Sequence, residues 1–344
     1  MAVALQDRYS KLVEAKLNAE IVQKDGVVWN NSYEGEPKAG AVKIPVRGAA
    51  AVVSYNKQNG ATKSFTEGSY DTLNIDKDYA VNEVIDNYDA ESVPDNIVAD
   101  RLDAAGEALA LQQNTDGTNE LLDKATVLGQ TSATSKSNIY DRIADAGTAL
   151  TKSHVPATNR FMLVNPDAMA FVRKSAEFIA ASALGDTVKQ TGAVGMISGF
   201  LVLEDATLPA HANFICGHKN WCCRVKEWAV NVHKQSLDGS GVYIGASAIQ
   251  GRRIYGHKVT NSKAVVMDSG VLNPTVAIAS HTATVTLGTN ATGAKYRIKH
   301  GDTWGDWTTY NGSSKPTTAA NDTIEVYGFD AAGVRSGIVS QIDA

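Results

Sequence analysis

Apolar positions at helical spacing open the chain and return in its second quarter. The first such stretch, Leu5 to Ile21, predicts an amphipathic helix. A longer helix is predicted over residues 92–127, where apolar residues at i, i+4, i+7 and i+11 form one stripe. Ser92 and Pro94 suit its first turn, and the polar run Asn114–Gly117 predicts an interruption before the helix resumes.

Period-two alternation marks the segment between these two stretches as rich in strands. Short β-prone runs cover residues 43–47, 50–55, 72–76 and 79–85, and Asn59-Gly60 is a hairpin-turn signal. Few of the side chains are large and apolar, so a two-stranded extension of this kind buries little core by itself. We therefore expect an extended β-hairpin that lies on another surface, which in an oligomer is a neighbouring subunit.

The middle of the chain alternates helical and strand patterns, as α/β regions do. A helix is predicted over residues 139–150, and a buried strand over residues 160–165 runs into a helix with Pro166 near its start. That helix is expected to continue from Val172 to Ala183. Further strands are predicted at residues 201–203, 214–216, 225–233 and 258–267, with a glycine-rich stretch at residues 239–251 between the last two.

A shift in composition at Leu272-Asn273-Pro274 separates the tail from the rest of the chain. Beyond it Thr, Asn and Gly dominate, and alternating runs at residues 283–287, 295–299, 323–327 and 337–342 predict short strands. We expect a small all-β sandwich in the tail, joined through a flexible region around Asn273.

Charge is distributed unevenly along the chain. There are 32 Lys and Arg against 37 Asp and Glu, a net charge of −5, which argues against a general nucleic-acid binder. Residues 66–107 contain twelve acidic and two basic residues, whereas residues 142–263 contain fourteen basic and eight acidic ones. Such blocks pair either within one chain or between copies of it, and a contact between copies weakens with salt.

Signatures of catalysis and of bound metal are weak. The sequence has no Walker A loop, no His-Glu-x-x-His and no Gly-x-Ser-x-Gly, and we interpret Gly239–Gly245 as a flexible loop. Cys216-Gly217-His218 and Cys222-Cys223 are the zinc candidates, but no Cys-x-x-Cys pair is present, so core thiols are the favoured interpretation. We expect no enzyme activity, no cofactor and no metal. No export signal is expected, because the first residues contain no apolar run of the kind a signal peptide has. No membrane span is expected either, because the longest apolar run is about half of the ~20 residues a membrane helix needs.

Aromatic residues gather in the tail, and they have two interpretations. Tyr296, Trp304, Trp307 and Tyr310 form a weak candidate for a glycan-binding platform, because an aromatic face offers apolar area with a polar edge. The favoured alternative is that Trp304 or Trp307 fills the core of the sandwich.

The order of these elements, an arm, an extended hairpin, a long helix and an α/β region that returns to strands, is distinctive. The runs Arg160–Met169, Lys226-Glu227-Trp228 and Tyr255–Val259 fit the entry into its α/β part and its late strands. The order resembles the major capsid protein of tailed bacteriophages, the α+β Hong Kong 97 fold, over residues 1–270. The resemblance implies an N-terminal arm (1–33), an extended β-hairpin loop with linking strands (34–90), a spine helix region (91–137), an axial α/β domain (138–224), return strands of the peripheral domain (225–271) and an appended immunoglobulin-like β-sandwich (272–344).

The resemblance also implies a function and partners. A protein of this family assembles with itself, as hexamers and pentamers, into an icosahedral head that encloses double-stranded DNA without binding it specifically. A separate scaffolding protein and a portal are implied, with assembly in the host bacterial cytoplasm, residence in the virion, no membrane, and host-surface glycan as a contact of the tail domain. Lys57 and Lys63 lie on the loop, but nothing marks a crosslinking partner for them.

Charged residues of the two blocks are the candidates for contacts between subunits. In order along the chain they are Lys43, Arg47, Glu67, Asp71, Asp76, Asp86, Asp95, Asp103, Arg142, Arg160, Arg173, Lys174, Arg252 and Arg253.

Two other functions stay open at this point. The first is a carbohydrate-active or surface-binding protein with an accessory β-sandwich, whose only adjacent carboxylate pair in the middle of the chain is Glu204-Asp205. Adjacent strand residues point to opposite faces, so the pair makes a poor two-carboxylate site. The second is another self-assembling phage protein, such as a tail-tube subunit.

Overall fold

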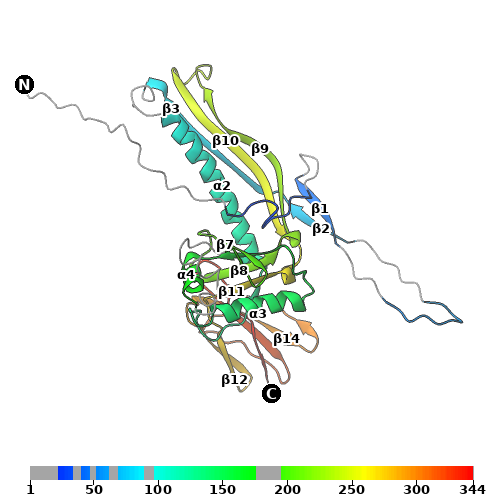
Figure 1. The fold of residues 1–344 in the computed structure, drawn as a ribbon. Coiled ribbons are helices and arrows are strands. Elements are labelled where there is room, and N and C mark those ends of the chain that lie inside the picture. The colour runs from blue at the N-terminus through cyan, green and yellow to red at the C-terminus, as the bar shows by residue number, and fades with distance from the viewer. Residues whose placement is uncertain are drawn as a thin grey trace, which may run out of the picture. The chain divides into compact units, whose positions relative to one another are not determined.

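A computed structural model describes residues 22–33, 40–46, 52–61, 69–88, 97–175 and 195–343. These residues fall into two compact units (Figure 1). The first unit holds the described parts of 30–112 and 223–260, and the second those of 21–29, 113–222 and 261–344. The helix predicted at residues 5–21 lies outside the described residues.

A three-stranded antiparallel sheet and a two-stranded ribbon make up the first unit, together with the first half of helix α2. The sheet has the order β3-β10-β9 and the ribbon pairs β1 with β2. Gly251 lies in the sheet between Leu109 of the helix and Val232 of β9. A Cβ on Gly251 would lie 2.7 Å from Val232 and 3.2 Å from Leu109. The elements are β1 Ala41–Val46, β2 Ser69–Asn74, β3 Lys77–Asp86, α2 Ile97–Lys124, β9 Cys222–Ser236 and β10 Ala246–Val259.

The strands predicted for this unit from the sequence agree for the most part with those in the structure. The runs predicted at residues 43–47, 72–76 and 79–85 are confirmed as β1, β2 and β3. The turn predicted at Asn59-Gly60 lies at residues 57–59 instead, where the pairing of Asn56 with Gly60 closes it. Residues 52–55, by contrast, are not a strand. The glycine-rich stretch at residues 239–251 was expected to separate two strands over its whole length. Strand β10 already begins within it, at Ala246.

Helix α2 runs without a break through residues 114–117, where the sequence predicts an interruption. The reason is tertiary packing. Gly117 faces the buried Trp29, whose ring would lie 2.8 Å from a Cβ at that position, and Gln23 would lie 2.7 Å from it. The indole Nε1 of Trp29 donates to Gln23 Oε1 at 3.0 Å, and Gln23 Nε2 donates to Thr118 Oγ1 at 2.6 Å. Local helix propensity is weaker than contacts of this kind.

A six-stranded mixed sheet, with the order β4-β11-β8-β5-β7-β6, forms the centre of the second unit. Side chains of α3 and α4 join its core, which includes Ile143, Leu150, Met169, Phe200 and Phe214. The elements are β4 Thr126–Leu128, α3 Ile139–Lys152, β5 Arg160–Val164, α4 Pro166–Lys174, β6 Met196–Ile197, β7 Phe200–Glu204, β8 Ala212–His218 and β11 Val265–Ser269.

The strand-to-helix passage at residues 160–166 is confirmed. Asn165 caps α4 by accepting from the amide of Asp167 at 2.9 Å, and Pro166 takes the first helical position. The predicted continuation through Ala183 is wrong at its start, because α4 ends at Lys174 and Ser175 is extended. Residues 176–194 lie outside the described part.

The strand predicted at residues 258–267 is two strands separated by a 3₁₀ turn at Ser262–Ala264. β10 ends at Val259 in the first unit, whereas β11 pairs with β8 and β4 in the second. The two units therefore divide at residue 260, within the stretch predicted as return strands.

Residues 272–343 form an all-β module within the second unit, which we call the C-terminal module. Its two sheets, β12-β13 and β15-β14-β17-β18 with β16 beside β14, enclose a core that includes Ala283, Val285, Ile324 and Val326. The small sandwich predicted from the alternating pattern is thus present. Its strands are β12 Thr275–Ala279, β13 Thr282–Thr286, β14 Gly293–His300, β15 Thr303–Trp304, β16 Thr308–Thr309, β17 Thr323–Phe329 and β18 Val339–Ile342.

The entry into the C-terminal module is fixed, so the predicted flexibility around Asn273 is wrong. The amide of Asn273 donates to the carbonyl of Gln130 at 2.8 Å, and its side-chain oxygen accepts from the amide of Gln130 at 3.2 Å. Gly337 lies directly against Gly129, since a Cβ on Gly337 would be 2.5 Å from the Gly129 Cα. Two backbone segments that approach this closely hold the module against the rest of its unit.

No helix in the part of the chain that the structure describes combines the length and the apolar character needed to cross a membrane.

Candidate functional site

Two ion pairs, one exposed and one half-buried, connect strands of the first unit. Arg252 of β10 donates to Asp78 of β3 through Nε at 2.7 Å and through Nη2, and the hydrogen bond from Arg252 lowers the pKa of Asp78. Trp228 of β9 lies 5.4 Å from the Arg252 guanidinium. The ion pair joins β3 to β10 and the indole extends the contact to β9, so an acidic and a basic residue of the two blocks already meet within one chain.

The base of the β1-β2 ribbon is fixed by a second pair. Lys258 Nζ lies 2.6 Å from Asp71 Oδ1 and donates to the carbonyl of Thr72 at 2.7 Å. Gly256 permits close contact here, because a Cβ would lie 2.3 Å from the carbonyl oxygen of Asn74. The ribbon thus starts from a rigid base.

Residues 52–61, which lie between the two strands of the ribbon, present apolar side chains to solvent. Val52 is 97% exposed and Tyr55 is 74% exposed. An isolated hairpin with few buried side chains is only marginally stable, so these side chains are suited to contact a second molecule.

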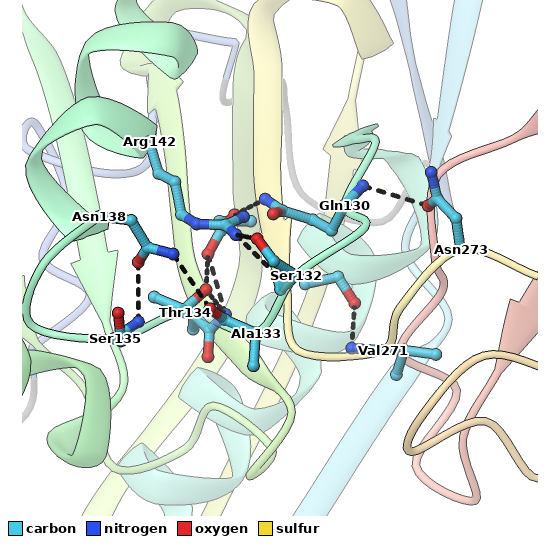
Figure 2. A network of polar contacts seen from close by, with 12 residues as sticks. Gln130, Ser132, Ala133, Thr134, Ser135, Asn138, Arg142, Val271 and Asn273 are labelled. Carbon is cyan, nitrogen blue, oxygen red and sulfur yellow. Dashed lines mark hydrogen bonds and ion pairs between the residues drawn. The ribbon is translucent and has the colours of Figure 1, made fainter.

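A buried polar network lies at the centre of the second unit (Figure 2). Asp268 of β11 is fully buried and accepts hydrogen bonds from Asn213 at 2.8 Å, from Thr134 at 3.0 Å and from Gln130. Arg142 of α3 reaches the same carboxylate at 3.3 Å and donates to the carbonyl of Ser132 at 2.7 Å. Burial raises the pKa of Asp268. The network ties the loop at residues 130–135 to α3, β8 and β11.

Arg160 is also used inside its own chain. Its guanidinium donates to the carbonyls of Pro156 at 2.8 Å and Val155 at 2.7 Å and lies 5.9 Å from the Phe200 ring. Burial lowers the pKa of Arg160. Because Arg142 and Arg160 are both buried among partners of their own chain, we retain neither among the candidates for contacts between subunits.

The other predicted interface residues occupy varied environments. Lys43, Asp86, Asp103 and Lys174 are exposed, Arg253 is half-buried, and Arg173 pairs with Glu204 at 2.7 Å. Asp71 and Arg252 pair within the first unit as described, and Asp76 lies 3.2 Å from Lys77. Arg47, Glu67 and Asp95 lie outside the described residues.

Glu204 and Asp205 lie in the second unit, and the three cysteines are divided between the units, with Cys223 in the first. Asp205 is buried and accepts from Gln23 at 2.9 Å and from Thr207, while Glu204 is held by Arg173, so the adjacent pair makes no two-carboxylate site. The prediction of core thiols is confirmed, since all three cysteines are buried. Burial raises the pKa of Cys216 strongly and that of Cys223 to about 11. Among the described residues no three His, Cys, Asp or Glu side chains are placed to hold a metal ion.

The four aromatic residues of the predicted glycan platform divide into two pairs. Tyr296 and Tyr310 pack against the core of the C-terminal module, and the Tyr310 hydroxyl accepts from the amide of Val285 at 3.3 Å. Trp304 and Trp307 instead flank Arg297, whose guanidinium lies 4.4 Å and 4.7 Å from the two rings. The favoured prediction that one tryptophan fills the core is therefore wrong. Small and branched side chains fill it, and both indoles remain partly exposed.

Sequence reasoning did not find Asp268 or Arg335. A lone carboxylate in the apolar strand Val265–Ser269 was an available signal, since a buried charge requires partners. Arg335 donates to the carbonyls of Leu122, Asp123 and Ala125 at 2.6–3.2 Å, at the end of α2. Nothing local in the sequence marks that contact.

Comparison with known proteins gives structural matches only. No protein-family model and no curated protein matches the sequence. A structure from Mycobacterium phage Che8 is 22% identical with a TM-score of 0.65, and the match covers 78% of this chain and 97% of that one. The capsid structure of the Cyanophage P-SCSP1u is 13% identical with a TM-score of 0.64, covering 77% and 92%. The capsid of a native GTA particle is 11% identical with a TM-score of 0.57, covering 77% and 95%. The chain therefore has the fold of these capsid structures, the Hong Kong 97-like α+β fold predicted from its sequence.

Proposed function

We propose that the chain is a major capsid protein, the subunit of an icosahedral phage head that encloses double-stranded DNA. The observation that carries the proposal is the match of fold along nearly the whole length of capsid structures, 92% of the cyanophage chain and 95% of the GTA chain. In this function the chain acts through its shape and its contacts with other copies. It is assembled in the bacterial cytoplasm and resides in the virion.

Features of the first unit support self-assembly. The exposed Val52 and Tyr55 lie beyond the rigid base that Lys258 gives the ribbon, so the tip is free to contact a neighbouring copy. The hexamers and pentamers of a shell supply such a neighbour at every position. Exposed charges such as Lys43, Asp86 and Lys174 remain the candidates for the pairs between copies.

The finer partners follow from the same proposal. A separate scaffolding protein and a portal assist assembly, and the acidic chain, with a net charge of −5, encloses DNA without binding it specifically. The immunoglobulin-like C-terminal module is an addition to the shell fold that faces outward and contacts carbohydrate of the host surface. In support, the matched structures are covered almost completely while about a fifth of this chain stays unmatched.

Expression of the full chain followed by electron microscopy of the fast-sedimenting fraction tests the proposal. We expect closed shells from the unchanged chain and none from Tyr55→Asp, because a charge at the ribbon tip opposes burial against a neighbour. Thr309→Asp, an exposed change on β16, is the matched control and is expected to leave shells intact. Shells that form equally well with Tyr55→Asp would contradict the role of the tip, and rods or rings in place of shells would contradict the function.

A further inference from the structure

The outward face of the five-stranded sheet in the C-terminal module carries basic and aromatic side chains. Residues 294, 296 and 298 of β14 pack into the core, so Lys295 and Arg297 share the opposite face. On the neighbouring strand β17, their cross-strand partners are Tyr327 and Glu325. The aromatic ring therefore lies opposite one of the two cations, and the carboxylate opposite the other.

This face borders two adjoining hollows in the second unit. The larger has a volume of about 620 Å³ and the smaller one of about 380 Å³. Asp123, Tyr327 and Arg335 line both, so the hollows form one elongated depression, which we call the α2-β17 groove. Its size suits a small ligand, for which sites of roughly 300–1,000 Å³ are typical.

Four cationic side chains line the groove, against the single carboxylate of Asp123. Two of the four are neutralised within the chain. Lys124 donates to Asp123 at 2.5 Å, and Arg297 donates twice to Glu325, at 2.8 and 2.6 Å. The lining carboxylate is therefore already used, and two cations remain.

The remaining cations, Lys295 and Arg335, have no anionic partner in the part of the chain that the structure describes. Lys295 makes no side-chain hydrogen bond or ion pair there. The Arg335 side chain donates to three backbone carbonyls, always through Nη2, so Nε and Nη1 keep their N–H groups for a ligand. Carbonyls at a helix end carry only part of a negative charge. The groove thus keeps a positive charge, and it favours an anion.

Neutral polar groups and an indole surround these cations. Hydroxyl groups of Ser262 and Tyr327 line the larger hollow, and each can donate and accept. Trp307 lies edge to face with Tyr327 at 4.7 Å and remains partly exposed, so it adds apolar surface. A ligand that combines carboxylates, hydroxyl groups and apolar C–H groups complements all of these features, and acidic sugars have that combination.

Nucleic acid, the other common polyanion, fits the groove less well. Single strands bind by stacking successive bases on aromatic rings. Here Arg297 already packs on Trp307, 4.7 Å from its ring. The ring of Phe329 lies over Gly293, because a Cβ on that glycine would be 2.6 Å from it. These rings are largely covered by their own chain, which disfavours a stack of bases.

We propose that the α2-β17 groove binds a carboxylated oligosaccharide. A sugar carboxylate accepts hydrogen bonds from Lys295 and from the remaining N–H groups of Arg335, while sugar hydroxyl groups bond to Tyr327 and Ser262. The proposal rests on the proposed carbohydrate contact of the C-terminal module, for which it names the class of sugar, and it is independent of shell formation. Of the four aromatic residues in the predicted glycan platform, only Trp307 lines the groove.

Calorimetry and saturation-transfer NMR on the full chain test it, with trigalacturonic acid, 3′-sialyllactose and a hyaluronan tetrasaccharide as acidic probes. The methyl ester of trigalacturonic acid is the matched neutral sugar, and an oligothymidylate represents nucleic acid. We expect at least one acidic sugar to bind, and an acid to bind about tenfold more tightly than its ester. Its binding should weaken as salt rises, because the groove remains open to solvent.

Two variants locate the site. Lys295→Gln removes a cation that has no structural partner and is expected to weaken binding about fivefold. Lys315→Gln, an exposed change in the same module outside the groove, is the matched control. Ser262 is exposed, and Ser262→Trp is expected to block the larger hollow without removing a core group.

Four results would each overturn the proposal. They are the absence of binding by all three acidic sugars, equal binding of the acid and its ester, tighter binding of the oligothymidylate than of any sugar, and binding that survives both Lys295→Gln and Ser262→Trp. Sedimentation of the same samples reports shell formation separately, so failure of the groove and failure of the capsid function are distinguishable.

Discussion

The ion pairs of the two units differ in where their charges lie. In the first unit, the side chains of Arg252 and Asp78 are 45% and 48% exposed. In the second, those of Arg142 and Asp268 are 10% and 0% exposed. Exposed pairs contribute little to stability and are screened by salt, whereas breaking a buried pair leaves an uncompensated charge in the interior. The first unit can therefore exchange its pairs for contacts with another copy at small cost, while the second holds a fixed geometry.

The largest expected effect is the loss of the buried pair. Asp268→Ala leaves the Arg142 guanidinium buried without its counter-charge, and we expect the free energy of unfolding to fall by about 3–5 kcal/mol. Urea unfolding followed by circular dichroism measures it. The double variant Arg142→Met/Asp268→Leu is the control, because it removes both charges together and is expected to recover most of the loss. A double variant as unstable as the single one would mean that the network stabilises through packing instead of charge.

A second effect concerns the attachment of the C-terminal module. Arg335→Ala removes hydrogen bonds from a cation to three carbonyls at the end of α2, so we expect a loss of about 1.5–3 kcal/mol in urea unfolding. Lys315→Ala, at an exposed position of the same module, serves for comparison and should change little. Equal effects of the two substitutions would show that the module folds without support from the helix.

Helix α2 allows the two units to be compared with one chemical change. Gly117→Ala places a Cβ within 2.8 Å of Trp29 in the second unit, and we expect it to lower the unfolding free energy by about 1–3 kcal/mol. Gly106→Ala, in the half of α2 that belongs to the first unit, meets nothing within 4 Å and is expected to raise it by about 0.5–1 kcal/mol. Thermal unfolding of both variants would reveal whether the signs are opposite, as this packing requires.

Alkaline pH acts on the core of the first unit. The pKa of Cys223 is raised from 9.0 to about 11 when the protein is folded, so the unfolded chain ionises first. The stability that this thiol contributes is present below pH 9 and is lost as the pH rises through 11, by about 2.7 kcal/mol at most. Unfolding at pH 8 and pH 10.5 measures the loss, and Cys223→Val should lack this part of it. An identical pH dependence in the variant would exclude Cys223 as its source.

The smallest effect is expected at the exposed pair. Asp78→Asn should leave the stability of the isolated chain nearly unchanged, in low salt and in high salt. Urea unfolding at two salt concentrations is sufficient to measure it. A loss comparable with that of Asp268→Ala would remove the difference between the two units.

Local signals in the sequence predict local structure well. The strand at residues 160–164 and the helix after it could be predicted because the signals are local. Asn165 caps the helix and Pro166 occupies its first position. The alternating pattern of the tail likewise predicts its strands, since one face of each is buried. The order of such elements was enough to suggest the fold that the capsid structures share.

What the sequence does not reveal depends on partners that are distant along the chain. Arg142 and Asp268 are 126 residues apart in the sequence, and Trp29 is likewise distant in the sequence from Gly117, against which it packs. Trp307 was expected in a core because nothing nearby in the sequence shows that Arg297 holds it at the surface. Arg335 and the end of α2 are in contact although they are more than 200 residues apart in the sequence. Only the folded chain brings these groups together.

Sedimentation velocity of the full chain at low and high salt, with negative-stain microscopy of the fast fraction, tests the capsid function most directly. We predict closed shells, or hexamers and pentamers, that dissociate as salt rises, because the contacts between copies use exposed charges and the exposed ribbon. Rods, rings, or oligomers that do not dissociate as salt rises would contradict it, whereas a chain that stays monomeric would contradict assembly without the separate scaffolding protein.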